Sequence, residues 1–227
     1  LESPVLSNAQ FEKFSNFFKK SIKILDCTFD KKTNLKQRLD ELQLEAEISV
    51  REGVKHIILT DQGINETRIL IPMALIIGAI NSRLKNLGIR GFVSINVQTS
   101  EAFDTHSFAV LLGVGATTIN PYITIDSIYQ RFEKKLFGQL TFEECVQRYV
   151  KSIDNGLLKI MSKMGISVLS AYRGGCNFEA VGLSRSIVAD YFPGMVSRIS
   201  GIGISGIEKK VRGLHEKAFQ KNVSILP

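Results

Sequence analysis

Few residues in this chain have the type and spacing that acid–base or metal chemistry needs. His106 is the strongest lone candidate, because Asp104 two residues earlier suggests an acid–base pair. Residues two apart on a helix point to different faces, so a histidine that bonds the backbone at a helix start is the simpler interpretation. His56 opens a predicted strand and His215 lies in a charged helix. The positions of the three histidines therefore do not indicate a shared metal site.

The three cysteines are widely separated and odd in number, at Cys27, Cys145 and Cys176. No pair has the spacing of a zinc site or a disulfide framework, which favours a reducing, cytoplasmic location. Cys176 follows Arg173, and a neighbouring cation can lower a thiol pKa enough to make a nucleophile. No histidine lies near it in sequence to act as a base, so we do not predict a catalytic cysteine.

Paired glycines raise the question of a phosphate-binding loop. Gly113 and Gly115 precede a predicted strand, whereas a dinucleotide fingerprint follows a strand and opens a helix. The segment 201–203 opens a helix but lacks the surrounding βαβ pattern. Gly174–Gly175 follows a predicted strand and has Arg173 beside it, which makes it the best anion-binding candidate. A tight turn is the simpler explanation there.

The elements that would position these residues alternate between helices and short apolar strands. Helices are predicted at 8–19, 35–53, 72–87 and 105–112, and strands at 56–60, 92–97 and 117–120, with a β-rich segment at 21–29. This alternation is typical of right-handed βαβ units. The fold class is therefore α/β, with a parallel β/α layer that forms a partial or degenerate (β/α) barrel or an open sheet.

The pattern changes in the second half of the chain. Long helices are predicted at 126–137 and 142–164, then a strand at 167–170, a loop at 171–177 and helical pieces at 184–191 and 205–217. We therefore expect main βα units over 1–122 and a helical extension with one more strand over 123–227.

Polar residues follow the predicted strands, where a parallel sheet commonly opens into a cleft. Asp61, Glu66 and Arg68 follow the strand at 56–60. One interpretation is a free-standing β/α enzyme or small-anion-binding module that uses Asp61, Asn120 and Arg173. The other is a salt-bridged loop that ties the sheet to a neighbouring domain. No residue has the partner that catalysis would require at a fixed spacing, so we favour a scaffold.

Composition excludes two further classes of protein. The net charge of +7 and the pI of about 9.3 are compatible with nucleic-acid binding. The cations are scattered among acids and no aromatic residues interleave with them, so that hypothesis rests on charge alone and we expect no nucleic-acid partner. No apolar run approaches the roughly 20 residues of a membrane span, so we expect no membrane partner.

Several segments together resemble one family, and the resemblance covers nearly the whole chain. They are Leu1 to Asn8, Ile58 to Asp61, Ile71 to Leu75, Ala116 to Tyr122, the run GLLKIMSKMGISVLSAYRGGCNFEAVG from Gly156 to Gly182, and Ser197 to Gly201. In these segments the chain is similar to the central domain of the glutamate synthase large subunit. It departs from the usual family pattern at Gln62, Ser107 and Cys176, where arginine, histidine and glutamine are common.

The resemblance implies a division of labour in a longer chain. An amidotransferase domain with an N-terminal cysteine releases ammonia from glutamine, and a tunnel leads it to an FMN domain with a 3Fe-4S cluster. There it reacts with 2-oxoglutarate, and reduction gives L-glutamate. The central domain joins the two and contributes to the tunnel wall. The residues that the resemblance suggests at interdomain or tunnel surfaces are Asp61, Arg68, His106, Asn120, Tyr122, Arg173 and Glu179.

The catalytic equipment of that enzyme is not visible in this sequence. There is no N-terminal cysteine, no closely spaced cysteine triplet and no glycine-rich FMN segment. We therefore expect no catalytic residues, cofactor or metal here, and FMN and 3Fe-4S only in the parent enzyme. The expected partners are the glutaminase and FMN domains and a small reductase subunit. The start at Leu1 suggests a fragment of a longer chain.

Overall fold

A parallel four-stranded sheet lies at the centre of the computed structural model, which describes residues 2–175 and 177–220. Its strands are β1 (Ile22–Asp26), β3 (His56–Thr60), β5 (Ser94–Gln98) and β6 (Thr118–Asn120), and they lie side by side in that order. Neighbouring strands thus follow one another along the chain, as they do in a (β/α) barrel. The predicted parallel β/α layer is confirmed as an open sheet of this kind.

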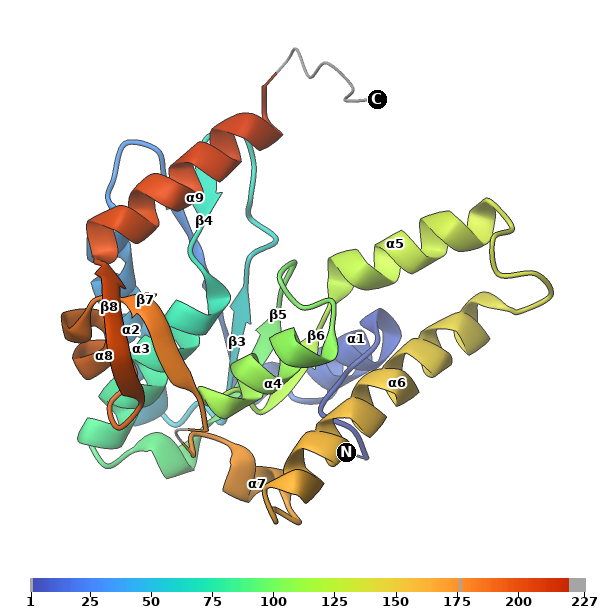
Figure 1. Cartoon of the computed structure of the whole chain (residues 1–227), viewed down its shortest axis with the longest axis horizontal. Coiled ribbons are helices and arrows are strands. Elements are labelled where there is room, and N and C mark those ends of the chain that lie inside the picture. The colour runs from blue at the N-terminus through green and yellow to red at the C-terminus, as the bar shows by residue number, and fades with distance from the viewer. Residues whose placement is uncertain (1, 176, 221–227) are drawn as a thin grey trace.

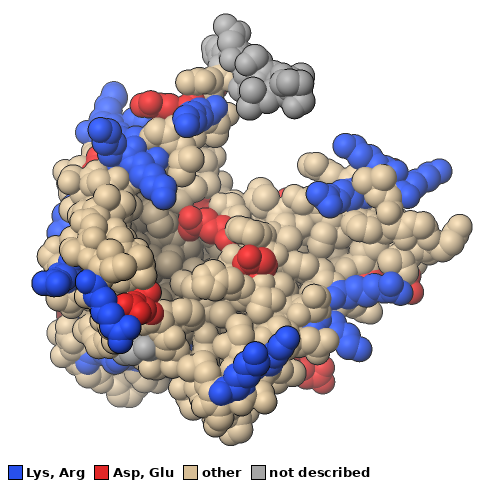
Figure 2. Space-filling view, in the orientation of Figure 1, with Lys and Arg blue, Asp and Glu red and all other residues tan. Residues whose placement is uncertain are grey.

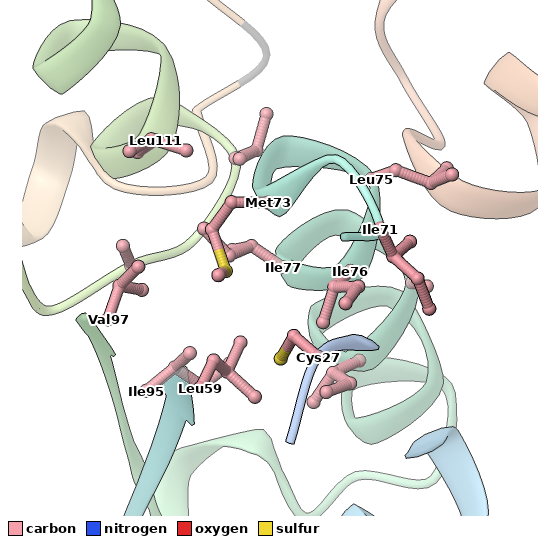
Figure 3. Close-up of a cluster of buried hydrophobic side chains, with 14 of the residues drawn as sticks. Cys27, Leu59, Ile71, Met73, Leu75, Ile76, Ile77, Ile95, Val97 and Leu111 are labelled. Atoms are coloured by element: carbon pink, nitrogen blue, oxygen red, sulfur yellow. The ribbon is translucent and has the colours of Figure 1, made fainter. Parts of the chain in front are cut away.

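Three helices between the strands cover one face of the sheet (Figure 1). They are α2 (Leu35–Arg51), α3 (Met73–Asn86) and α4 (Thr105–Gly113). Leu59, Ile95 and Val97 point from the strands toward Ile76 and Ile77 of α3 (Figure 3). All five are buried, and each contributes roughly 1.5–3 kcal/mol through removal of its side chain from water. This layer forms the main core.

Helix α1 (Asn8–Phe17) covers part of the opposite face, which a closed barrel would turn inward. Ser7 begins it with a capping box, as the sequence predicts. Its Phe11 packs with Leu6 and Ile58 in a second, smaller core. Just before the helix, the N-terminal segment pairs with the outer edge of β6, where the Leu6 amide donates to the Ile119 carbonyl at 2.9 Å. That edge is therefore covered.

Four short elements beside the sheet were not predicted as separate elements, although β2 (Thr28–Asp30) overlaps the β-rich segment predicted at 21–29. β2 and β4 (Arg68–Leu70) form an antiparallel pair, so Arg68 begins a strand rather than ending a loop. The 3-10 helices η1 (Lys19–Ser21) and η2 (Arg90–Phe92) each lead toward a strand, and η2 delays the start of β5 to Ser94. Segments of three residues carry too little periodicity for prediction.

Helices α5 (Tyr122–Glu133) and α6 (Phe142–Lys163) form an antiparallel arm that extends away from the main body (Figure 1). The first of them begins and ends before its predicted bounds of 126–137. Thr141 starts α6 with a capping box to Glu144. None of the described helices is long and apolar enough to cross a bilayer.

The predicted strand at 167–170 is wrong, because α7 (Leu169–Tyr172) occupies its second half and the first half forms no strand. The outer edge of β6 is already paired with the N-terminal segment, so a further strand finds no partner there. A helical turn instead buries Tyr172, whose hydroxyl donates to the Ala109 carbonyl at 3.3 Å. The extension therefore does not add one strand to the central sheet.

The extension instead contains two strands that form their own parallel pair, β7 (Glu179–Leu183) and β8 (Val196–Ile202). Between them lies α8 (Arg185–Tyr191), and α9 (Ile204–Ala218) ends the described fold. Val181 and Ile199 of the pair are exposed, so the strands lack the alternation of burial that sequence patterns report.

The second half of the chain folds back over the first, with α8 against α3 and α9 against α2. Two aromatic rings lie on glycines of the main body. A Cβ atom at Gly78 of α3 would lie 2.3 Å from the Phe192 ring, and one at Gly113 of α4 would lie 2.2 Å from Phe178. Both halves share one hydrophobic core as a result.

Candidate functional site at the carboxyl edge of the sheet

A row of polar side chains crosses all four parallel strands at their carboxyl ends. Asp26, Thr60, Gln98 and Asn120 occupy matching register positions. The Thr60 hydroxyl donates to Gln98 Oε1 at 3.0 Å, and Gln98 Nε2 donates to Asn120 Oδ1 at 3.3 Å. Asn120 Nδ2 donates in turn to the Leu6 carbonyl at 3.0 Å. The ends of β3, β5 and β6 are thus joined by side chains as well as by backbone.

Asp61, the first residue after β3, is fully buried beside this row. Its carboxylate accepts hydrogen bonds from the Thr99 hydroxyl at 2.7 Å, and from the Ser100 amide at 2.8 Å and hydroxyl at 3.0 Å. The phenol of Tyr122 also bonds it, and burial together with the Asp61 charge raises the pKa of Tyr122. Asp61 therefore fixes the loop after β5, and the bonds of its Oδ2 go to that loop rather than toward a substrate.

Two further charged groups at this edge also have internal partners. Arg68 Nη2 donates to Asp26 Oδ2 at 2.8 Å, so its ion pair is with Asp26 rather than with Asp61. Glu101 accepts the Met73 amide at 2.5 Å and so occupies the N-terminus of α3. Burial chiefly raises the pKa of Glu101, the Asp61 charge adds to this effect, and the Met73 amide opposes it.

The remaining predicted residues lie elsewhere. Asp104 caps α4 by accepting the Ser107 amide at 2.8 Å, and this explains its position near the exposed His106 without an acid–base pair. Glu179 opens β7, where it makes an exposed ion pair with Arg198. Arg173 lies at the amino edge of the sheet, where it donates to Thr117 Oγ1 at 3.1 Å. Asp61, Asn120 and Arg173 therefore do not form one site.

The glycine candidates are also explained by local structure. Gly174 donates its amide to the Gly113 carbonyl at 2.8 Å, and Gly175 donates to the Tyr172 carbonyl at 3.2 Å. These amides are occupied and cannot cradle a phosphate. Gly174 has φ +69°, as a tight turn requires. Cys176, the nucleophile considered above, lies outside the described residues.

Sequence reasoning missed Asp26, Gln98 and Glu101. A signal for the first two exists, because each ends a strand and parallel strands share one edge. Finding them requires the register between strands, which adjacent sequence does not supply. Glu101 has no such signal, since its partner Met73 belongs to a different βα unit.

Comparison with known proteins places the chain in a family. A profile described as glutamate synthase central domain matches residues 1–184. The NADPH glutamate synthase large chain of Azospirillum brasilense is 48% identical over 230 residues, which cover 100% of this chain and 15% of that protein. The chain belongs to the glutamate synthase central domain family.

Other relatives agree with this membership. The NADPH glutamate synthase large chain of Bacillus subtilis is 37% identical over 226 residues, and the ferredoxin-dependent chloroplastic glutamate synthase of Oryza sativa is 35% identical over 239. Each alignment covers 99% of this chain and 15% of the relative. A mutant flavocytochrome b2 with benzoylformate aligns with 73% of the chain at 11% identity and a TM-score of 0.47, a likeness that supports no conclusion about function.

The residues of this glutamate synthase central domain do not fit FMN at the carboxyl edge. A flavin phosphate requires cations or free amides, whereas this edge carries Asp26, Asp61 and Glu101, and Glu101 already occupies the N-terminus of α3. An iron–sulfur cluster requires closely spaced thiolates. Cys27 and Cys145 are both buried, one after β1 and one in α6, and burial raises the pKa of Cys27 well above its usual value. Within the described part of the chain, no three His, Cys, Asp or Glu residues could hold a metal.

Proposed function

We propose that residues 1–227 form a scaffold that joins the glutaminase and FMN domains of a glutamate synthase large chain and contributes to the ammonia tunnel between them. In this proposal the parent enzyme makes L-glutamate from L-glutamine and 2-oxoglutarate in the cytoplasm. FMN and the 3Fe-4S cluster lie in other domains, and a small reductase subunit supplies electrons. This chain spans 15% of the length of the relatives it matches, so these activities belong to the longer protein.

The carboxyl edge is the observation that carries this proposal. In (β/α) enzymes, catalytic side chains project from this edge toward the substrate. Here the candidates bond the surrounding fold instead, with Asp61 held by Thr99 and Ser100 and Asn120 held by Leu6. A free-standing enzyme at this edge is therefore disfavoured, and a rigid support for neighbouring domains is favoured.

The arm supplies a second line of support. Leu136, between α5 and α6, is 66% exposed, and Ile123 and Tyr129 of α5 are also exposed, as is Phe103 in the loop before α4. Figure 2 shows a hollow between the arm and the main body, with acidic side chains at its centre and basic side chains on both rims. Exposed apolar residues of this kind are typical of a surface that another domain covers. We assign that role to the flanking domains.

The predicted interdomain residues take different parts in this proposal. His106, exposed at the start of α4, and Glu179, at the start of β7, are candidates for direct contact with a neighbouring domain. Asp61, Asn120 and Tyr122 hold the loops from which such a surface or tunnel wall is built. Arg68 braces the same edge through Asp26.

A test of this role requires the full large chain. We expect Leu136→Asp to weaken docking of the arm and to lower glutamine-dependent glutamate synthesis about tenfold, the effect of losing one interface anchor. Synthesis from added ammonia should persist, because the FMN domain is unchanged. Leu44→Asp, at an exposed apolar position of α2, is the matched control. Equal loss of both activities, or no loss of either, would contradict the scaffold role.

The isolated 227-residue chain gives a complementary test. It should elute from gel filtration without flavin absorbance after incubation with FMN. Stoichiometric bound flavin would show that the domain holds the cofactor itself.

A further inference from the structure

An open pocket of about 560 Å³ lies at the amino edge of the central sheet, opposite the polar row. It is lined where β3, β5 and β6 begin, by η2, the end of α3 and the turn after α7. Its lining includes four cationic side chains from separate segments, which are Lys55, Lys85, Arg90 and Arg173. No carboxylate occurs among the described residues that line it.

The charges of these four side chains are not neutralised within the described residues. None of them takes part in a salt bridge, although exposed arginines elsewhere in the chain do. Arg90 is held by neutral acceptors, with Nε donating to Asn81 Oδ1 at 2.7 Å and Nη1 to the Val93 carbonyl at 2.6 Å. Burial and the nearby charge of Arg173 lower the pKa of Arg90 to about 10.

The fold therefore holds the Arg90 guanidinium where burial and the neighbouring Arg173 both disfavour its positive charge. Neutral acceptors orient Arg90 but do not compensate its desolvation, and Arg173 is held close by Thr117 rather than allowed to swing away. An external anion would supply the missing compensation, because charge-assisted hydrogen bonds to oxyanions are about twice as strong as neutral ones.

The other lining groups suit an oxyanion. The hydroxyls of Ser94, Thr117 and Ser170 line the pocket beside the cations. His56 also lines it, and its buried Nδ1 has no hydrogen-bond partner among the described residues. The ring packs against Phe14 and Phe18, which fixes its position. Hydroxyl donors around paired cations are the usual receptor for a phosphate or a carboxylate.

We propose that this pocket binds a small oxyanion that carries at least two negative charges, of the phosphate or polycarboxylate class. Arg90 and Arg173 form its inner contacts, and Lys55 and Lys85 add charge at its mouth. Such a site differs from a free-standing enzyme at the carboxyl edge, and it does not depend on the scaffold role. It gives the central domain a ligand of its own, remote from the hollow beside the arm.

The test uses the full large chain at constant ionic strength, with pyrophosphate and citrate as probes and potassium chloride as the reference salt. Hydrogen exchange followed by mass spectrometry should show protection of residues 89–96 and 168–174 by at least one of the two probes. Calorimetry should give a dissociation constant about tenfold weaker for Arg173→Gln and several-fold weaker for Lys85→Gln. Arg90 is left unchanged because its guanidinium holds three acceptors.

Lys159→Gln is the matched control, since Lys159 is an exposed lysine of α6 away from the pocket and loses the same charge. It should bind the probe as the unaltered chain does. The proposal is overturned if all three variants weaken binding equally, because that result reports only net charge. It is also overturned if neither probe protects the two segments, as when an acidic segment of the parent chain already fills the pocket.

Discussion

The two ends of the central sheet differ in how the charges of their side chains are compensated. At the carboxyl end, Asp26 pairs with Arg68, and Asp61 collects donors from Thr99 and Ser100. At the amino end, Arg90 and Arg173 lie close together and have only neutral partners among the described residues. Enzymes with (β/α) folds usually keep reactive groups at the carboxyl end and stabilising contacts at the amino end. Here the carboxyl end is internally satisfied, and the amino end has unbalanced charge.

Replacement of Asp61 at the carboxyl end is expected to lower the free energy of unfolding more than any other change considered. Asp61→Ala removes the acceptor of three hydrogen bonds and leaves buried donors unpaired, so the free energy of unfolding should fall by about 3 kcal/mol. Urea denaturation of the 227-residue chain, followed by circular dichroism, measures this change. Asp190→Ala, at an exposed position of α8, should change it by less than about 0.5 kcal/mol. Equal losses of unfolding free energy in the two variants would show that Asp61 does not stabilise the carboxyl edge.

Glu101 introduces a pH dependence at the same end. Its pKa is raised in the folded protein, so the folded state binds a proton that the unfolded state releases. The resulting stabilisation is complete below the unfolded pKa near 4.5 and is lost as pH rises through the folded pKa. Glu101→Gln should lack this component, so the stability of the variant relative to the unaltered chain should rise with pH. Denaturation curves at several pH values between 4 and 8 test this prediction, and a constant difference would contradict it.

Arg68→Gln should cost less than the loss of Asp61. The pair with Asp26 is partly exposed and screened by solvent, so we expect a loss of about 1 kcal/mol, mostly from the bonds to Asp26 and Thr28. Arg198→Gln removes the more exposed pair with Glu179 and should be near neutral. Urea denaturation compares the two variants. A larger loss for Arg198→Gln would reverse the order expected from exposure.

Removal of a cation at the amino end should raise the free energy of unfolding rather than lower it, and the change should be the smallest of the four. Lys55→Gln removes one of four neighbouring cations, so in anion-free buffer the free energy of unfolding should rise by a few tenths of a kcal/mol. Added salt should erase the gain, because screening weakens the repulsion between exposed charges. Lys159→Gln should show no comparable gain at low salt. A loss of stability in Lys55→Gln would mean that the cations have partners within the fold.

Local patterns in the sequence predict much of this arrangement. Ser7 begins α1, apolar runs mark β3 and β5, and Gly88, with a φ of 70°, follows the end of α3. The segment 167–170 shows where such patterns fail. Its residues suit a strand, but the N-terminal segment already occupies the edge of β6. That pairing joins residues more than a hundred positions apart, and no local window contains it.

The same limit applies to the two ends of the sheet. Asp61, Asn120 and Tyr122 are identifiable because each lies next to a predicted strand end, and all three lie at the carboxyl edge. The amino-edge pocket unites Lys55, Arg90 and segments near Arg173 from three separate parts of the chain. Only the assembled fold shows that these cations line one pocket with no carboxylate among the described residues around them.

The aromatic rings that rest on Gly78 and Gly113 have a mechanical consequence. Phe192 and Phe178 contact two neighbouring helices, α3 and α4, at separate points. One such contact would permit rotation in any direction about itself, whereas two leave only rotation about the line that joins them. A force on the C-terminal half is therefore transmitted to α3 and α4 through the two glycines, which carry no side chain. A single methyl group at either glycine would displace the ring that contacts it and change how load passes through the domain.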